Sequence, residues 1–530
     1  MAKNNSVAVI GAGLGGLSAA IRLAYKGYDV HLFEKNNSAG GKAGNLQMGN
    51  YRFDTGPSLL TLPFILEELF CDVDEDINDY IEIQKLKILC RYFYPDGTVL
   101  NAYSENNLFA NEVSLKTRDT KEAVYRYFNY CRRIYELTSE LFLKKPFTEL
   151  STFFSLSAIK SLINVKSIDA FRNVHQANQS FFEDPRTVQL FDRYATYNGS
   201  NPYLSPATLN IIAYVENILG GYYASEGIYS IPTALERLAR EKGVKIYFNT
   251  PVEKIIITKG EASGVRINGK DISFDVVISN CDSVYTNIML LKGSKYHKVQ
   301  EDKAWREKST LSPSTSAIVF YWAVEAKHSI LEAHNILFSE DYAKEFNEIF
   351  NKKICPADPT VYIYISSKLI TSDAPENCEN WFVMINVPEN SGQDWQQLGF
   401  NIKEKVIVKI EKMLGIDIRD KIVMERVLTP KDIEDNTNSW QGSLYGPASN
   451  SRLSAFKRQS NRSSKYKGLF YTGGSAHPGG GIPLVILSGK ITSELIEKYH
   501  RSKKTGKDNT GRRKSINDQS FRKQISQNNF

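Results

Sequence analysis

The N-terminal segment constrains the fold of this 530-residue chain more than any other feature. Residues 6–35, SVAVIGAGLGGLSAAIRLAYKGYDVHLFEK, have the pattern of a strand, a tight turn, a helix and a second strand. Gly11, Gly13 and Gly16 form a GxGxxG turn, where a pyrophosphate can approach the backbone at the helix N-terminus. Glu34 ends the second strand, where a carboxylate accepts hydrogen bonds from a ribose. The segment therefore predicts a parallel α/β sheet that binds a dinucleotide.

A second glycine cluster, SAGGKAG at 38–44, follows the acidic strand and favours FAD over NAD. The whole pattern resembles the amine-oxidase and carotenoid-desaturase superfamily of flavoproteins, which implies cofactor contacts at Gly41 and Lys42. The superfamily usually has arginine at this lysine, and a lysine meets a phosphate as a point charge without the bidentate fork.

The segment DTGPS at 54–58 resembles the next motif of the superfamily, which lies beside the flavin. The resemblance implies cofactor contacts at Asp54, Gly56 and Pro57. A local turn closed by the aspartate side chain is the alternative interpretation.

The other dense glycine cluster is GGSAHPGGGIPLVILSGK at 473–490. Leu469 to Tyr471 are expected to form a strand, Gly473 to Gly481 a loop, and Pro483 the first turn of a helix. A loop without side chains that leads into a helix N-terminus suits a flavin ring, whose developing negative charge the helix dipole, roughly +0.5 charge, would stabilise. The predicted contacts are Gly473, Gly480, Gly481 and Ile482.

The motif HPGGGIPLVILSGK resembles the C-terminal signature of bacterial carotenoid desaturases of the phytoene desaturase type. With similar stretches at 227–255 and 275–286, the resemblance covers most of residues 1–500. It implies an FAD-dependent oxidoreductase in which the main chain of Val252 binds the adenine side.

The implied fold is α/β: a discontinuous, Rossmann-like FAD-binding domain with a mixed-sheet substrate domain and a helical cap. The cofactor domain is expected to comprise 1–95, 226–290 and 446–500. The substrate domain is expected to comprise 96–225 and 291–445, and its cap to face the membrane. Residues 501–530 are expected to be a basic, disordered tail.

The stretch YATYNGSNPY at 194–203 resembles the subgroup of desaturases that act on 1-hydroxylated acyclic carotenoids at the 3,4 bond. Asn198, Ser200 or Asn201 would then bind the terminal hydroxyl, and turn formation is the alternative role of these residues. Desaturation of phytoene or of a diapophytoene-type substrate is the nearest rival function. A retinol-saturase-like reductase and a non-catalytic isoprenoid carrier are further alternatives.

The resemblance implies that a hydride leaves an allylic carbon for flavin N5 while a neighbouring carbon loses a proton. The cation is delocalised over the polyene, which weakens the need for a strong base. His477 is the candidate proton acceptor, with a structural role bonding the backbone as the alternative. Asp192 and Arg193 are interpreted either as a polar pair that shapes the substrate tunnel or as salt bridges between cap helices.

Composition limits the partners and the location. The six cysteines lack CxxC or CxxH spacing, so we predict no metal and a reduced, cytoplasmic setting. No signal peptide or run of about 18 apolar residues occurs. The electron acceptor implied by the family is oxygen or a quinone, because no second GxGxxG offers a nicotinamide site.

The net charge of +7 falls within 501–530, where nine Lys or Arg oppose two Asp, so residues 1–500 are neutral. This tail and the mixed apolar and basic segment 140–166 predict peripheral contact with anionic lipid at the inner face of the cell membrane. A solvated tail and an ordinary cap helix are the alternatives. No nucleic-acid-binding module accompanies the basic residues, so nucleic acid is not an expected partner.

Overall fold

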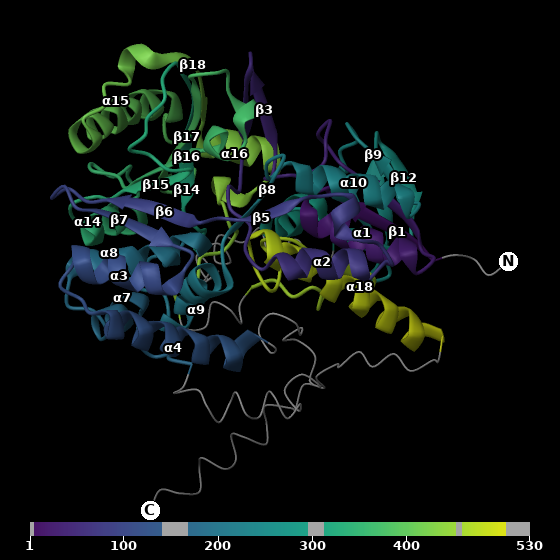
Figure 1. The fold of residues 1–530 in the computed structure, drawn as a ribbon. Helices are drawn as coiled ribbons and strands as arrows, with labels where there is room; N and C mark the ends of the chain where they lie inside the picture. Colours follow the sequence, from purple (N-terminus) through teal and green to yellow (C-terminus); the bar gives the residue numbers. More distant parts are fainter. Residues whose placement is uncertain (1–4, 140–167, 295–311, 452–457, 505–530) are drawn as a thin grey trace, which may run out of the picture.

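The computed structural model describes residues 5–139, 168–294, 312–451 and 458–504. A five-stranded sheet with its helices occupies one side of the molecule and a seven-stranded sheet with its helices the other (Figure 1). The segment 140–166 and the tail beyond 504 lie outside the described residues, so the predictions of membrane contact for them stay predictions.

The first sheet is entirely parallel, in the order β19-β13-β1-β2-β9. Its strands come from three distant stretches of the chain: β1 Ser6–Ile10, β2 Asp29–Phe33, β9 Lys245–Tyr247, β13 Val276–Ser279 and β19 Leu469–Tyr471. Every residue of β13 and β19 is buried, as in parallel sheets covered on both faces. The predicted βαβ unit and the predicted strand at 469–471 are confirmed.

Helices cover one face of this sheet and a small antiparallel sheet covers the other. Val7 and Val9 pack with the helices, whereas Ala8 and Ile10 pack with the small sheet, because side chains alternate along a strand. The helices are α1 Leu14–Tyr25, α2 Pro63–Cys71, α10 Ser230–Glu241 and α18 Ile482–Lys504. The small sheet consists of β10 Lys254–Thr258, β11 Glu261–Ile267 and β12 Lys270–Ser273.

The second sheet is mixed, in the order β18-β14-β17-β16-β15-β6-β7, with β15 and β6 as its parallel pair. Its strands are β6 Ile88–Phe93, β7 Val99–Tyr103, β14 Ser316–Val324, β15 His334–Leu337, β16 Val361–Ile365, β17 Glu379–Val387 and β18 Ile422–Leu428. One face packs against α15 Trp395–Leu414. Since β6 belongs to this sheet, the chain changes sheets ahead of residue 95.

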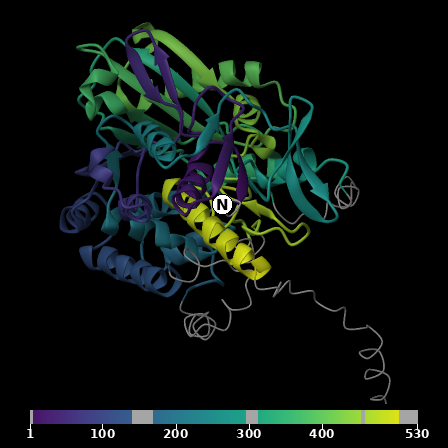
Figure 2. The ribbon, with the colours of Figure 1, turned by 90° about the vertical axis from the view of Figure 1, so that its right-hand side faces the viewer.

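Helices pack on the other face of β6 and β7, most of them below these strands in Figure 1. They are α3 Asn106–Lys116, α4 Lys121–Thr138, α7 Val174–Gln179, α8 Pro185–Asp192, α9 Ile211–Tyr214 and α14 Tyr342–Asn347. Figure 2 shows them grouped beneath the second sheet. Among the helices of the described residues, none combines the length and hydropathy that crossing a bilayer requires.

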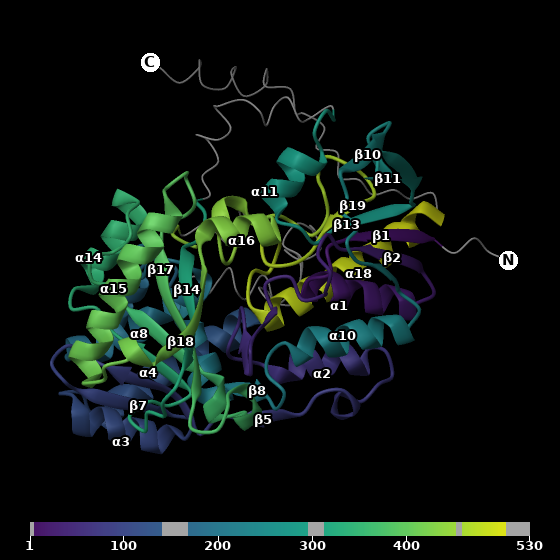
Figure 3. The same cartoon turned by 90° about the horizontal axis from the view of Figure 1, so that it is seen from above.

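Short elements complete the fold, and α16 Pro430–Thr437 lies between the two halves (Figure 3). The other strands are β3 Asn45–Met48, β4 Tyr51–Asp54, β5 Ile83–Lys85 and β8 Tyr222–Ala224, and α11 is Ser283–Tyr285. The 3₁₀ turns are η1 Ile77–Asp79, η3 Arg193–Asn198, η4 Ala207–Asn210, η8 Ser366–Lys368, η9 Thr371–Asp373, η10 Arg419–Lys421 and η11 Trp440–Gly442. The π-helical turns are η5 Val215–Leu219, η6 Thr286–Leu290 and η7 Glu348–Lys352.

Candidate functional site

The N-terminal glycine turn joins β1 to α1 and leaves the helix start open to a ligand. Gly13 precedes α1 with extended backbone and no side-chain cap, and the first turn holds no acidic residue. The positive end of the helix is therefore free to meet an anion. The buried Glu34 carboxylate lies beside this turn, because its Oε2 accepts the Ala12 N–H at 2.7 Å and its Oε1 accepts the Asn36 N–H at 2.9 Å.

The C-terminal glycine loop folds back onto this turn. A Cβ on Gly473 would lie 2.6 Å from Asn280 Oδ1, and a Cβ on Gly15 would lie 2.9 Å from the Gly473 nitrogen. Asn280, which follows β13, donates from Nδ2 to the Gly11 carbonyl at 3.3 Å. Beginning, middle and end of the chain thus meet around one asparagine, and no side chain fits between them.

The far end of the glycine loop presents bare backbone. Gly481 has φ +102°, and a Cβ built there would meet no atom within 4 Å. Gly480, which precedes it, lies against the Tyr445 ring, and α18 begins at Ile482, the residue after Gly481. Bare backbone beside a helix N-terminus leaves room for the flat ring of a flavin, and the predicted contacts of Gly480, Gly481 and Ile482 with it stay predictions.

Arg458 fixes the loop and was not predicted from the sequence. Its guanidinium donates to the carbonyl oxygens of Gly474 at 2.6 Å, Pro447 at 2.9 Å and Tyr445 at 3.2 Å. Burial lowers the pKa of this guanidinium to about 10, so it stays charged at neutral pH. Its position outside every glycine motif gave no signal of this role.

Lys42 and Gly41 border the N-terminal turn. The Lys42 ammonium donates to the carbonyl oxygens of Ser443 at 2.8 Å and Leu444 at 2.7 Å. Burial lowers its pKa to about 8, and the nearby Asp282 carboxylate partly opposes this shift. Lys42 therefore ties the second glycine cluster to the 443–444 segment, and its predicted contact with a phosphate stays a prediction.

Asp54 anchors the start of α10. Its two carboxylate oxygens accept the N–H groups of Ile228 and Tyr229, each at 3.0 Å. Arg52 pairs with Asp54 at 3.1 Å and with Asp373 at 2.6 Å. These partners hold the DTGPS segment in place, and direct contact of Asp54 with the cofactor stays a prediction.

The rest of the DTGPS segment, which includes Pro57, lies between the glycine cradle and the second sheet. A Cβ on Gly56 would come within 1.8 Å of the Lys42 carbonyl oxygen. On the other side, Tyr321 donates from its hydroxyl to the Thr55 carbonyl at 3.1 Å, and the Ser58 hydroxyl lies 2.6 Å from that of Tyr362. The DTGPS segment therefore contacts the glycine cradle on one side and the second sheet on the other.

Val252 lies near Glu34, since the nearby Thr250 donates its N–H to the Glu34 carbonyl at 2.8 Å. Within the described residues, neither the N–H nor the C=O of Val252 makes a hydrogen bond. Both groups are available to the edge of an adenine, which suits the predicted main-chain contact.

His477 is buried at 6% exposure in the glycine loop. Its N–H donates to the Gln459 carbonyl at 2.9 Å, and its own carbonyl accepts from Asn461 Nδ2 at 2.9 Å. These bonds involve only its main chain, so the suggested role of the imidazole as a proton acceptor stays a prediction.

The predicted hydroxyl-binding residues have internal partners. Asn198 donates from Nδ2 to the Ser449 hydroxyl at 2.6 Å, and Ser200 accepts the Ser449 N–H at 2.8 Å. Asn201 donates its N–H to Asn450 Oδ1 at 2.8 Å. The contacts fasten this turn to the 449–450 loop, and the substrate role of the turn stays a prediction.

Asp192 and Arg193 do not pair with each other. Asp192 contacts His175 Nδ1 at 2.5 Å, which joins α8 to α7, and burial raises the pKa of this aspartate. Arg193 pairs with Glu216 at 2.9 Å, which joins η3 to η5. The geometry matches the interpretation of these residues as salt bridges between helices.

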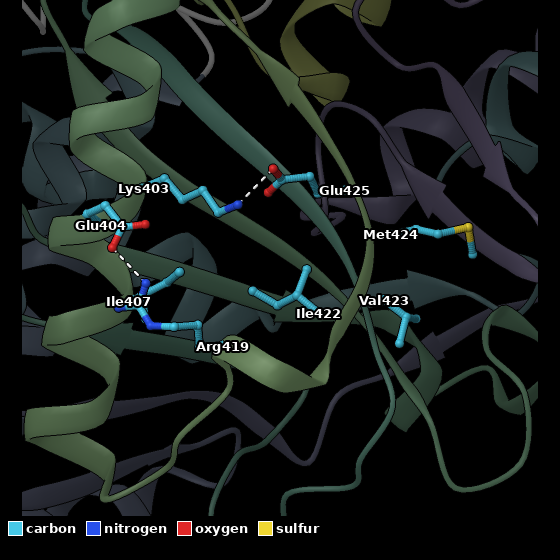
Figure 4. Close-up of a pocket in the computed structure, with 8 residues that line it drawn as sticks. All are labelled: Lys403, Glu404, Ile407, Arg419, Ile422, Val423, Met424 and Glu425. Carbon is cyan, nitrogen blue, oxygen red and sulfur yellow. Dashed lines mark hydrogen bonds and ion pairs between the residues drawn. The ribbon is translucent and has the colours of Figure 1, made fainter.

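Two pockets lie on the second sheet and its helices, and none of the predicted cofactor residues lines them. The pocket in Figure 4 measures about 220 Å³ between α15 and β18, and ion pairs of 2.7 Å cross it from Lys403 to Glu425 and from Arg419 to Glu404. The second, about 690 Å³, contains His175 and Asp192. In the described ranges, no group of three or more His, Cys, Asp or Glu side chains could hold a metal ion.

Solved structures share this fold. A putrescine oxidase bound to putrescine matches with a TM-score of 0.61 at 11% identity, covering 93% of this chain and 99% of that one. An oxidoreductase from Methanosarcina mazei matches with a TM-score of 0.60 at 16% identity, covering 93% and 100%. At these identities the matches establish the fold, a Rossmann-like domain joined to a mixed-sheet domain.

Sequence comparisons establish the family. A model described as flavin containing amine oxidoreductase matches residues 14–328. A 1-hydroxycarotenoid 3,4-desaturase of Flavobacterium sp. (strain P99-3) is 42% identical, covering 92% of this chain and 98% of the relative. A 4,4'-diaponeurosporene oxygenase of Staphylococcus haemolyticus (strain JCSC1435) is 33% identical, covering 92% and 96%. Together with the glycine cradle, these matches show that the chain belongs to the flavin-containing amine oxidoreductases and is an FAD-dependent oxidoreductase.

Proposed function

We propose that this flavoenzyme desaturates an acyclic carotenoid that carries a hydroxyl at carbon 1, and that it introduces the double bond between carbons 3 and 4. The observation that carries the proposal is the 42% identity to a desaturase of that name along 92% of the chain. The match covers both the half built on the five-stranded sheet, called here the cofactor half, and the half built on the seven-stranded sheet, called here the substrate half. We assign the choice of substrate to the substrate half.

In this proposal one half of the molecule binds the cofactor and the other binds the hydrocarbon. Bound FAD supplies the hydride acceptor. The glycine turns and Glu34 are placed to hold it, and Arg458 keeps the C-terminal loop in position beside it. The second sheet and its helices carry clusters of buried apolar and aromatic side chains. We assign the binding of the hydrocarbon to this half, where each CH₂ that it buries gains about 0.8 kcal/mol.

Anaerobic mixing of the purified yellow protein with a 1-hydroxylated acyclic carotenoid tests the proposal. We expect the absorption of oxidised flavin to bleach and the product to have lost two hydrogens. Turnover of phytoene alone would refute the hydroxylated substrate, and an unchanged flavin spectrum with both compounds would identify a carrier. Loss of a double bond under reducing conditions would identify a reductase.

A second candidate function is oxygenation of a carotenoid end group. It is favoured by the 33% identity to a 4,4'-diaponeurosporene oxygenase over 92% of this chain. Mass spectrometry of the aerobic product separates the two functions, because a desaturated product loses two hydrogens and an oxygenated product gains oxygen.

We further propose that the enzyme works at the cytoplasmic surface of the membrane, which dissolves its apolar substrate, and that it passes electrons to oxygen or a quinone. The charge of residues 501–530 supports the membrane contact. Deleting 505–530 should weaken binding to anionic vesicles at low salt, whereas unchanged binding would assign the contact to another surface. Flavin reoxidation by air and by a soluble quinone identifies the acceptor.

A further inference from the structure

One face of the second sheet carries a row of aromatic side chains that points toward the cofactor half. Tyr321, Phe382, Tyr364 and His334 are successive cross-strand neighbours on β14, β17, β16 and β15. Adjacent to this row, Tyr362 on β16 contacts Ser58 through a 2.6 Å hydrogen bond between hydroxyls. The opposite face packs against α15. The aromatic row therefore borders the DTGPS segment.

His334 is the histidine of this row, and one of its two ring nitrogens has a hydrogen-bond partner within the described residues. Its Nδ1 lies 2.8 Å from the Tyr362 hydroxyl, and its ring stacks on Tyr364 with centroids 4.8 Å apart. Its Nε2 is buried and makes no hydrogen bond within the described residues, although the side chain is only 3% exposed. Burial, with a contribution from the charge of Arg193, lowers its pKa to about 3, so the ring is neutral at physiological pH.

The charged groups nearby have partners of their own. Arg193 donates from Nε to the Tyr92 hydroxyl at 2.8 Å and from Nη2 to Glu216 at 2.9 Å. Glu216 also accepts hydrogen bonds from the Tyr194 and Tyr197 hydroxyls. These bonds occupy the charged groups of Arg193 and Glu216, whereas His334 Nε2 is among the buried polar atoms that have no partner within the described residues.

An isolated buried nitrogen costs free energy, and a hydroxyl is well suited to pair with it. A hydroxyl both donates and accepts, so it satisfies Nε2 whichever ring nitrogen carries the hydrogen. We propose that His334 binds the terminal hydroxyl of the substrate through Nε2 and makes the enzyme prefer a hydroxylated end group over an unmodified one. The proposal rests on the proposed function, because it assigns a residue to the recognition of that substrate.

The position of His334 agrees with the short separation between the substrate hydroxyl and the reacting bond. In a substrate hydroxylated at carbon 1 and desaturated between carbons 3 and 4, carbon 2 alone separates the hydroxylated carbon from the reacting bond. The residue that binds the hydroxyl must therefore lie beside the reaction site. Through Tyr362 and Ser58, His334 connects to a segment whose Gly56 touches the Lys42 carbonyl of the glycine cradle.

The test compares kcat/KM for a 1-hydroxylated acyclic carotenoid with kcat/KM for the same carotenoid lacking the hydroxyl. In His334→Phe we expect the ratio of the two values to fall by about tenfold to a hundredfold, because a site built for a hydroxyl discriminates strongly against its absence. His334→Asn, which keeps a donor and an acceptor, should restore part of the ratio. Loss of folded enzyme lowers both values equally and leaves the ratio intact.

His328→Phe is the matched control. This imidazole pairs with Glu379 at 2.9 Å and packs on Trp381, away from the aromatic row, so its removal should not change the ratio. A wild-type enzyme that prefers the hydroxylated substrate, with the same preference in His334→Phe, would overturn the inference and leave the proposed function standing. A wild-type enzyme that turns over neither compound would overturn the proposed function itself.

Discussion

The two halves of the molecule are built in opposite ways. In the cofactor half, glycines leave bare backbone where distant segments meet beside helix N-termini. In the substrate half, large side chains cover one face of a sheet, and a few buried polar atoms lack partners within the described residues. A cofactor shared by many enzymes can be held by a common backbone shape, whereas an individual substrate requires individual side chains.

Adding a side chain to the glycine loop should have the largest effect on flavin binding. In Gly473→Val the new Cβ would lie 2.6 Å from Asn280 Oδ1, at a residue with φ +95°. Backbone strain alone costs about 1–3 kcal/mol, and the clash adds to it, so we expect flavin affinity to fall about a hundredfold or more. Gly260→Val is the matched control, because Gly260 has φ +84° but nothing within 4 Å. The flavin absorbance per protein measures both variants, and a fully loaded Gly473→Val would contradict the close approach.

Breaking the buried ion pair of the substrate half should destabilise the fold without removing the flavin. Arg193→Met leaves Glu216, which is 1% exposed, without its cation. We expect the free energy of unfolding to fall by about 3–5 kcal/mol, as for other buried pairs that lose one partner. The double variant Arg193→Met/Glu216→Gln should recover most of the loss. Urea denaturation monitors both, and equal stability of single and double variants would argue against the charge pairing.

Loosening the C-terminal loop should have an intermediate effect. Arg458→Gln removes the charge and shortens the reach toward the Gly474, Pro447 and Tyr445 carbonyls. Hydrogen bonds to charged groups contribute about 1.5–3 kcal/mol, so flavin affinity should weaken by about tenfold to a hundredfold. Titration of the flavin-free variant with FAD gives the dissociation constant. An unchanged constant would mean that the loop keeps its shape without Arg458.

The smallest expected effect concerns pH. The pKa of Lys42 is about 8 when folded, below its ordinary value of 10.5. Between these values the unfolded chain holds a proton that the folded chain has lost, so stability rises with pH across this window. The unfolding midpoint of the flavin-free protein should therefore rise more from pH 8 to 10 than that of Lys42→Gln. If a phosphate meets Lys42, FAD will raise this pKa and narrow the difference.

The contrast between a backbone-built cofactor half and a side-chain-built substrate half also explains which features the sequence could predict. Gly11, Gly13, Gly16 and Glu34 form a local motif with fixed spacing, so the strand, turn and helix around them followed from the sequence. The loop at 473–481 could be assigned to the same cofactor because backbone without side chains has few other uses. The domain ranges were inferred by resemblance, and β6 shows that the chain enters the second sheet before residue 95.

The substrate half resisted prediction because its contacts join residues far apart in sequence. Arg193 stands next to Asp192 in the chain, yet its partner Glu216 lies on another helix. The row that contains His334 exists only through strand register, which no local pattern specified. Arg458 acts on three carbonyl groups, and a carbonyl is present at every residue, so sequence could not reveal its target.

The parallel sheet has a consequence for how the enzyme is made. Its strand β19 and the covering helix α18 lie within the last described stretch, 458–504, while β1 and α1 are synthesised first. Until the ribosome has released the C-terminal region, β13 remains an uncovered edge and the helix α1 lacks its main packing partner. The glycine cradle is therefore incomplete until residues 458–504 have been synthesised and have folded onto β13 and α1.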